Sequence, residues 1–184
     1  MILYIHGFKS CAKSNKSEIL RRRFKEVVSP DLPPSPKEAF RLLCETVEER
    51  EPKLIVGSSL GGYYAVALSQ RYSIRSVLIN PSLKPYITLL PFVGENRRYC
   101  DGEPFEWSEE HIKELIELKC EKIDRENYLV LLQSGDELLD YRESLNLFWG
   151  GKVVVEYGGN HRFENLCEYL DMIENFLKGG DGCD

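Results

Sequence analysis

The chain has 184 residues, a length that suits one domain with a single hydrophobic core. Hydrophobic residues make up 42% of it and charged residues 29%, which is ordinary globular composition and excludes a disordered or fibrous protein. The formal net charge of −6 argues against nucleic acid as a partner.

Short apolar runs alternate with amphipathic runs along the chain. The apolar runs are rich in β-branched residues, which is typical of buried parallel strands, and they cover Ile2–Ile5, Val27–Val28 and residues 54–56, 77–79, 128–132 and 153–155. Apolar residues recur at helical spacing over residues 17–26, 35–50, 60–71, 108–120, 140–148 and 163–177. This alternation predicts one compact α/β domain over residues 1–178, with three layers and a mostly parallel central sheet.

Two segments depart from this rhythm. Prolines at positions 81, 85, 91 and 104 interrupt residues 80–107, which show no clean period. We expect an irregular, lid-like excursion over one edge of the sheet, at about residues 81–107. The last six residues, 179–184, are polar and rich in glycine, and we expect a flexible tail there.

The cysteines and the apolar runs bear on metal sites and on location. The six cysteines are widely spaced and form no C-x-x-C pair or Cys/His cluster, so no metal or other cofactor is indicated. The apolar run at the N-terminus is too short for a signal peptide, and no run approaches the ~20 residues of a membrane span. We therefore expect a cytoplasmic protein with mostly reduced thiols and no membrane partner. Neither the oligomeric state nor any cysteine pairing follows from the sequence.

The motif G-x-S-x-G occupies residues 57–61, between a predicted strand and a predicted helix. A nucleophile on such a sharp turn has a strained backbone, and Gly57 and Gly61 lack the side chains that would keep the turn from closing. The alternative is a tight turn with a capping serine. We take Ser59 as the candidate nucleophile and Ser58 as a structural hydroxyl.

A serine hydroxyl needs a base to accept its proton, and the chain has three histidines. In folds with this motif the order along the chain is serine, acid, histidine, with the histidine after the last strand. His161 lies there, behind a pair of glycines, and is the candidate base; the alternative is an exposed loop histidine. His111 is placed on an amphipathic helix and is expected to be an ordinary surface residue.

Three acids compete for the role of orienting the histidine, because Asp136, Glu137 and Asp140 all follow the strand predicted at 128–132. We prefer Asp136, which follows the glycine nearest the strand end. Asp140 is expected to cap the next helix, although it stays an alternative, and Glu137 is expected to face solvent. All three could also belong to a solvated turn.

The segment His6-Gly7-Phe8 follows the first strand, where such enzymes complete the oxyanion hole. Negative charge that develops on a carbonyl oxygen needs donors already aimed at it. We expect the backbone N–H groups of Phe8 and Leu60 to supply them. Gly7 supports this loop, and His6 is expected to act as a structural hydrogen-bonding residue.

Five stretches together are far more specific than G-x-S-x-G alone: residues 4–8, 57–65, 80–81, 135–142 and 158–163. Through them the chain resembles the YqiA/YcfP-type (UPF0227) esterases of the α/β-hydrolase superfamily, and the resemblance extends over nearly the whole chain. It implies a three-layer α/β-hydrolase fold and esterase activity on short acyl esters or thioesters.

The resemblance also implies a catalytic triad of Ser59, Asp136 and His161. Two departures from the family pattern flank the histidine, since Asn160 stands where aspartate is frequent and Arg162 where a small or polar residue is frequent. We expect Arg162 to narrow or charge the mouth of the site, which bears on the range of substrates.

The predicted function is acyl transfer from a small-molecule ester or thioester through an acyl-enzyme intermediate. A peptidase or a thioesterase would use the same triad, and a binding protein could keep the fold without turnover. Apolar residues of the irregular segment are expected either to line an acyl pocket or to shield the sheet edge; they are Tyr86, Ile87, Leu89, Leu90, Phe92, Tyr99, Phe105 and Trp107.

Overall fold

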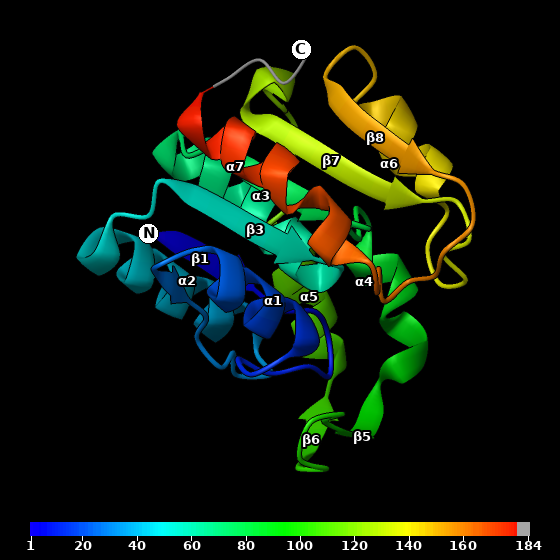
Figure 1. The fold of residues 1–184 in the computed structure, drawn as a ribbon. Coiled ribbons are helices and arrows are strands. Elements are labelled where there is room, and N and C mark those ends of the chain that lie inside the picture. Colours follow the sequence, from blue (N-terminus) through cyan, green and yellow to red (C-terminus); the bar gives the residue numbers. More distant parts are fainter. Residues whose placement is uncertain (180–184) are drawn as a thin grey trace.

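Six parallel strands form one sheet in the computed structural model, which describes residues 1–179 (Figure 1). The strands are β1 (Ile2–Ile5), β2 (Val27–Val28), β3 (Leu54–Ser58), β4 (Ser76–Ile79), β7 (Tyr128–Gln133) and β8 (Lys152–Glu156). Their order across the sheet is β2-β1-β3-β4-β7-β8. All of the predicted strands are present, and because they are parallel, the loops that follow them meet at one edge of the sheet.

Helices cover both faces of the sheet, so the predicted three-layer architecture is confirmed (Figure 1). On one face lie α1 (Asn15–Arg23) and α7 (Leu170–Lys178); on the other lie α2 (Pro36–Arg50), α3 (Leu60–Tyr72), α5 (Glu109–Glu117) and α6 (Tyr141–Leu147). Successive strand residues point to opposite faces, so that Leu3 joins the core under α2 and α3 whereas Ile2 joins the core under α1 and α7.

Three helices begin or end clearly elsewhere than expected, and the one predicted over 108–120 ends already at Glu117. The helix predicted over 17–26 runs instead from Asn15 to Arg23, because the Ser14 hydroxyl caps its first turn and Phe24 is already extended. The helix predicted over 163–177 begins only at Leu170. Phe163 is fully buried, and its N–H donates to the Asn160 carbonyl at 3.1 Å. Its φ of +50° lies outside the right-handed helical region, so the helix cannot start there.

The segment expected to be irregular contains regular structure. It forms the short helix α4 (Pro85–Thr88), a 3-10 turn at Leu90–Phe92, and an antiparallel hairpin of β5 (Gly94–Arg97) and β6 (Pro104–Trp107). In Figure 1 the hairpin extends from the body of the protein below α5. Its strands have few apolar residues and little burial, so they lack the pattern that identifies a strand in sequence.

A disulfide joins Cys11, in the loop after β1, to Cys100 in the turn of the β5–β6 hairpin, with the Cα atoms 6.5 Å apart. The sequence left the pairing of cysteines open, and Cys44, Cys120 and Cys167 are free. The expectation of mostly reduced thiols therefore stays a prediction. Distant segments of the chain that come together only in the fold bring the pair within bonding distance.

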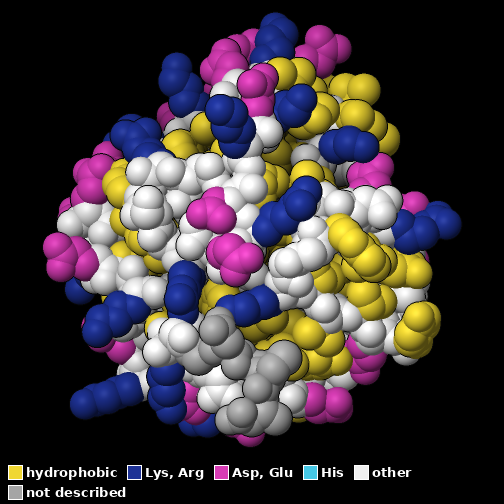
Figure 2. Space-filling model, turned by 90° about the horizontal axis from the view of Figure 1, so that it is seen from above, with side chains coloured by type: hydrophobic (Ala, Val, Ile, Leu, Met, Phe, Trp, Pro, Cys, Tyr) yellow, Lys and Arg dark blue, Asp and Glu magenta, His cyan; other side chains and the backbone are white. Residues whose placement is uncertain are grey.

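Gly179 ends α7 with φ of +83°, and the remainder of the predicted tail, 180–184, lies outside the described residues. None of the helices within residues 1–179 combines the length and the apolar character needed to cross a membrane. On the face shown in Figure 2, basic and acidic side chains are interspersed, and hydrophobic side chains gather mainly at one side.

Candidate active site

Ser59 lies on a sharp turn between β3 and α3, with φ of +54° and ψ of −120°. This left-handed backbone is strained for a serine, and the N–H of Ser59 anchors it by donating to the Ile79 carbonyl at 3.1 Å. A Cβ atom at Gly57 would overlap the carbonyl of Gly61, and one at Gly61 would overlap the carbonyl of Ile5. The two glycines of the motif are therefore required by the close packing of this turn.

The loops after β3, β7 and β8 bring Ser59, Asp136 and His161 into contact. The Nε2 atom of His161 lies 3.0 Å from the Ser59 Oγ, and its Nδ1 atom lies 2.8 and 3.0 Å from the two carboxylate oxygens of Asp136. The Asp136 side chain is 1% exposed and that of His161 16%. Because a carboxylate can only accept, Nδ1 carries the proton, and Nε2 is free to accept the serine proton.

Of the three competing acids, Asp136 is the one whose carboxylate contacts the imidazole. Asp140 caps α6, accepting from the Arg142 N–H at 3.0 Å. Glu137 is exposed, but its Oε2 also accepts from the backbone N–H of His161 at 3.0 Å, and this bond lowers the pKa of Glu137. The Glu137 side chain thus holds the histidine loop through the backbone N–H of His161, a role that the sequence did not indicate.

Asn80, which the sequence analysis assigned no role, ties the histidine loop to the sheet. It follows β4, is 2% exposed and has φ of +38°. Its Nδ2 donates to the carbonyls of Asn160 at 3.1 Å and His161 at 3.4 Å, and its Oδ1 accepts from the Gln133 N–H at 2.9 Å. The sequence signals at this position were a polar residue directly after an apolar strand and its place in one of the stretches that carry the family resemblance.

Gln133, at the end of β7, extends the same network. Its Oε1 accepts from the Asn160 N–H at 3.0 Å, while its Nε2 donates to Glu156 at 2.6 Å and to Asn165 at 2.7 Å. Tyr169 donates to Glu156 at 3.0 Å, and these hydrogen bonds lower the pKa of the Glu156 carboxyl. The loop that contains His161 is therefore held from both sides by satisfied polar groups.

The two proposed oxyanion donors flank the serine. Leu60 is the first residue of α3, so its N–H has no acceptor within the helix. The loop that contains Gly7 and Phe8 passes beside the serine, because a Cβ atom at Gly7 would lie 3.1 Å from the Ser59 Cβ and 3.7 Å from its Oγ. Both backbone segments are therefore placed next to the hydroxyl.

His6 holds the loop that contains Gly7 and Phe8 through hydrogen bonds of its imidazole. It is 5% exposed, its Nδ1–H donates to the Gly7 carbonyl at 2.9 Å, and its Nε2 accepts from the Leu32 N–H at 3.3 Å. Burial lowers the pKa of His6, which keeps the imidazole neutral, as the accepting Nε2 requires. His6 makes structural hydrogen bonds and does not contact the serine and histidine pair.

Aromatic side chains of the hairpin segment, residues 85–107, surround Phe8. Its ring meets those of Trp107, Phe92 and Phe105 edge to face, at centroid distances of 4.9, 5.6 and 5.7 Å. Trp107 is itself buried and donates from Nε1 to the Leu89 carbonyl at 3.2 Å. These contacts thus fix the side chain of Phe8, one of the two proposed oxyanion donors.

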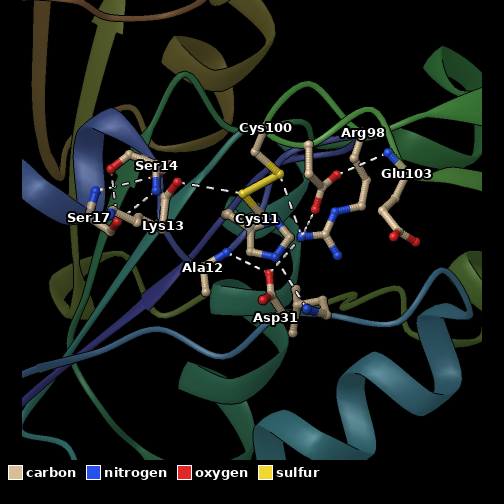
Figure 3. The surroundings of a disulfide bond; sticks show 12 residues. Cys11, Ala12, Lys13, Ser14, Ser17, Asp31, Arg98, Cys100 and Glu103 are labelled. Carbon is tan, nitrogen blue, oxygen red and sulfur yellow. Dashed lines mark hydrogen bonds and ion pairs between the residues drawn. A yellow bond between two sulfur atoms is a disulfide. The ribbon is translucent and has the colours of Figure 1, made fainter.

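The Cys11–Cys100 disulfide joins the hairpin to the loop after β1, the loop that also contains Gly7 and Phe8 (Figure 3). Beside it, Asp31 accepts from the Ala12 N–H at 2.8 Å and pairs with Arg98 of the hairpin at 3.2 Å. The disulfide and this ion pair connect the loop after β1, the loop after β2 and the hairpin.

Two cavities adjoin these residues. The first, the serine cavity, measures about 700 Å³ and is lined by Tyr4, Gly7, Phe8, Ser10, Ser14, Asn15, Lys16, Ser58, Ser59, Tyr99, Glu137, Leu138, His161, Arg162 and Glu164. The second, the aromatic cavity, measures about 420 Å³ and is lined by His6, Gly7, Phe8, Lys9, Ser10, Asp31, Leu32, Pro33, Pro34, Leu60, Tyr64, Arg98, Glu103, Pro104, Phe105 and Trp107.

Lys16 is the most perturbed cation near the serine. Burial, followed by the neighbouring charge of Arg162, lowers the pKa of its ammonium group to about 8. Its Nζ donates to the Arg162 carbonyl, which ties the start of α1 to the histidine loop. Within residues 1–179, no group of three His, Cys, Asp or Glu side chains is placed to hold a metal ion.

The parallel sheet, the serine on its strand-to-helix turn and the acid and histidine after the last two strands define the α/β-hydrolase fold. The chain belongs to the Uncharacterised protein family (UPF0227), whose model matches residues 1–178. A relative named UPF0227 protein YcfP, from Salmonella paratyphi A, is 32% identical over 195 aligned positions, covering 96% of this chain and 98% of the relative.

Solved structures have the same fold at low sequence identity. A putative hydrolase from Agrobacterium vitis S4 matches with a TM-score of 0.73 and 16% identity, over 97% of this chain and 86% of that one. The esterase domain of a Rhodothermus marinus protein matches with a TM-score of 0.72 and 19% identity, over the same shares. At these identities the likeness establishes the fold alone.

Proposed function

We propose that the chain is a serine hydrolase that cleaves short acyl esters or thioesters through an acyl-enzyme intermediate. The observation that supports this most directly is the unbroken hydrogen-bonded series from Ser59 through His161 to Asp136, beside a cavity. Strain at Ser59 supports it too, because such backbone persists where the surrounding structure maintains it, commonly at active sites.

In this mechanism His161 accepts the proton of Ser59 as the Oγ attacks the ester carbonyl carbon. The N–H groups of Phe8 and Leu60 donate to the oxyanion that forms. The buried Asp136 carboxylate orients the imidazole and stabilises it while it is charged. His161 then gives the proton to the leaving oxygen or sulfur, and a water that it activates releases the acid.

Esters come first in the proposed range of substrates because solved structures of this fold include an esterase domain. A small-molecule ester or thioester is the proposed partner, and the acid–base groups themselves suit any acyl transfer. Peptide substrates should therefore be tested beside esters and thioesters. The cytoplasmic location expected from the sequence stays a prediction.

A fluorophosphonate probe tests the nucleophile, combined with hydrolysis of p-nitrophenyl acetate. Wild-type protein should be labelled and turn over, and Ser59→Ala should lose the label and roughly 10⁴-fold or more in rate. Ser58→Ala is the matched control, since it removes the neighbouring hydroxyl, and it should keep the label. Folded wild type that takes no label, or Ser59→Ala with the wild-type rate, would overturn the proposal.

A further inference from the structure

The aromatic cavity begins at the two proposed oxyanion donors. Phe8 and Leu60 both belong to its lining, and it shares Gly7 and Phe8 with the serine cavity. Ser59 and His161 both line the serine cavity, and neither lines the aromatic cavity. The two cavities therefore meet at the loop that contains Gly7, Phe8 and Ser10, which passes beside Ser59.

The geometry of acyl transfer gives each cavity a different part of the substrate. Once the Ser59 Oγ has attacked, the former carbonyl carbon holds three other groups: the oxyanion, the leaving group and the acyl chain. The leaving atom has to take its proton from the Nε2 of His161, so it faces the serine cavity. The oxyanion faces the two N–H donors, and the acyl chain is left with the remaining direction, past Phe8 and Leu60.

The chemistry of the two linings agrees with this division. Phe105 and the buried Trp107 form apolar walls of the aromatic cavity, together with Leu60 and Pro33. Arg98 lies at this cavity, where Asp31 and Asp101 pair with it at 3.2 and 3.1 Å and balance its charge. Charged side chains of both signs line each cavity, with Lys9 and Glu103 at the aromatic cavity and Lys16 and Glu164 at the serine cavity. The aromatic cavity is distinguished by its apolar walls of Phe105 and Trp107, which the serine cavity lacks.

We propose that the aromatic cavity is the acyl-binding pocket, that Phe105 is a specificity-determining residue in it, and that the substrates are esters of compact apolar acids with a polar alcohol or thiol. This inference rests on the proposed function and narrows it. It also divides the apolar residues of the hairpin segment, because Phe105 and Trp107 line this pocket whereas Ile87 and Leu90 are more than half exposed.

The volume of the aromatic cavity limits the size of the acyl group that fits in it. Below that size, the burial of each methylene determines how steeply kcat/KM rises with chain length. Each further methylene that enters an apolar pocket should raise kcat/KM about fourfold, until the roughly 420 Å³ are filled. Beyond that length kcat/KM should level off or fall. At about 30 Å³ for a group the size of a methylene, this volume holds roughly fourteen of them, so the wild-type profile over p-nitrophenyl esters from acetate to stearate should show a defined optimum.

Phe105→Ala and Phe92→Ala form a matched pair of variants. Both remove one edge-to-face contact with Phe8, at 5.7 and 5.6 Å, but only Phe105 belongs to the lining of the cavity. Phe105→Ala should move the optimum to longer acyl chains and raise the ratio of kcat/KM for octanoate over butyrate at least tenfold relative to Phe92→Ala. Leu32→Phe, which adds bulk to the same cavity, should move the optimum to shorter chains.

Fluorophosphonate labelling separates failure of the pocket from failure of the proposed function. If all variants are labelled and the Phe105→Ala and Phe92→Ala profiles coincide, the aromatic cavity does not bind the acyl chain, and the proposed function stands. If folded wild type is neither labelled nor active, the proposed function fails and the pocket assignment falls with it. Opposite shifts in Phe105→Ala and Leu32→Phe would establish the pocket.

Discussion

Replacement of Asn80 should detach the histidine loop from the sheet without touching any of the three triad side chains. In Asn80→Ala the buried N–H of Gln133 loses its acceptor, at a cost of about 1–3 kcal/mol. The carbonyls of Asn160 and His161 lose their donor, for roughly another 0.5–1.5 kcal/mol together if water reaches them. Alanine at φ of +38° adds about 1 kcal/mol of backbone strain. The sum is a loss of about 2.5–5.5 kcal/mol in the free energy of unfolding.

Two further variants divide this sum into its parts. Asn80→Gly removes the same hydrogen bonds but relieves the backbone, so it should be about 1 kcal/mol more stable than Asn80→Ala. Asn80→Asp keeps an acceptor for the Gln133 N–H and replaces the amide donor by a carboxylate oxygen, which repels the carbonyls of Asn160 and His161. That variant tests the positioning of the histidine loop most directly.

Urea unfolding measures the stability of each variant, and steady-state kinetics with p-nitrophenyl acetate measures its effect on the reaction. Because a displacement near 1 Å can cost about 10²-fold in rate, kcat of Asn80→Asp should fall roughly 10- to 100-fold. KM should stay near the wild-type value, since Asn80 lines neither the serine cavity nor the aromatic cavity. Wild-type kcat and wild-type stability in Asn80→Asp would refute this reasoning.

Three other predictions concern the acid, the disulfide and the buried histidine. Asp136→Asn should lower kcat by roughly 10⁴-fold with little change in KM, because an amide that donates to Nδ1 favours the wrong tautomer. Reduction of Cys11–Cys100, which are 89 residues apart, should lower the free energy of unfolding by roughly 2–4 kcal/mol in urea titrations. Because burial lowers the pKa of His6, the unfolded chain binds the proton more readily. The stability contributed by its neutral form should be complete above about pH 6.5 and be lost as the pH falls further, which unfolding of wild type and His6→Gln at several pH values would detect.

Each of these three predictions has a matched control. Glu137→Gln keeps an acceptor for the His161 N–H and should lose far less activity than Asp136→Asn; equal losses would argue against Asp136 as the orienting acid. Cys167→Ser should respond to reductant as wild type does, whereas a Cys11→Ser/Cys100→Ser variant should not respond. His111→Gln should keep the wild-type decline of stability with falling pH. If His6→Gln also keeps it, the decline has another source.

Several features follow from local sequence and could therefore be predicted. The strands appear as apolar runs because a parallel sheet is buried on both faces. The turn at Ser59 appears as a pattern because its glycines are required by contacts within a few residues and with the adjacent strand. Asp136 and His161 could be placed because the loops after parallel strands meet at one edge of the sheet. Their contact distances, in contrast, come from the fold.

Other features depend on contacts between segments far apart in the chain, and no local pattern marks them. Phe163 interrupts an otherwise helical spacing because the core on the α7 side takes its ring. The β5–β6 hairpin escaped notice because each strand has only four residues and β5 has no apolar side chain. The Cys11–Cys100 pair and the hydrogen bonds of Asn80 join residues 89 and about 50 to 80 positions apart.

The sequence by itself determined the α/β class, the strands of the central sheet and the residues proposed for chemistry, because periodicity and short motifs record interactions that are local or repeated along an element. Only the tertiary structure decided which acid meets His161, what holds its loop, and that the aromatic cavity lies beside Phe8 and Leu60. Hydrogen bonds and cavity walls form between side chains from different elements. Their geometry exists only once the elements have packed together.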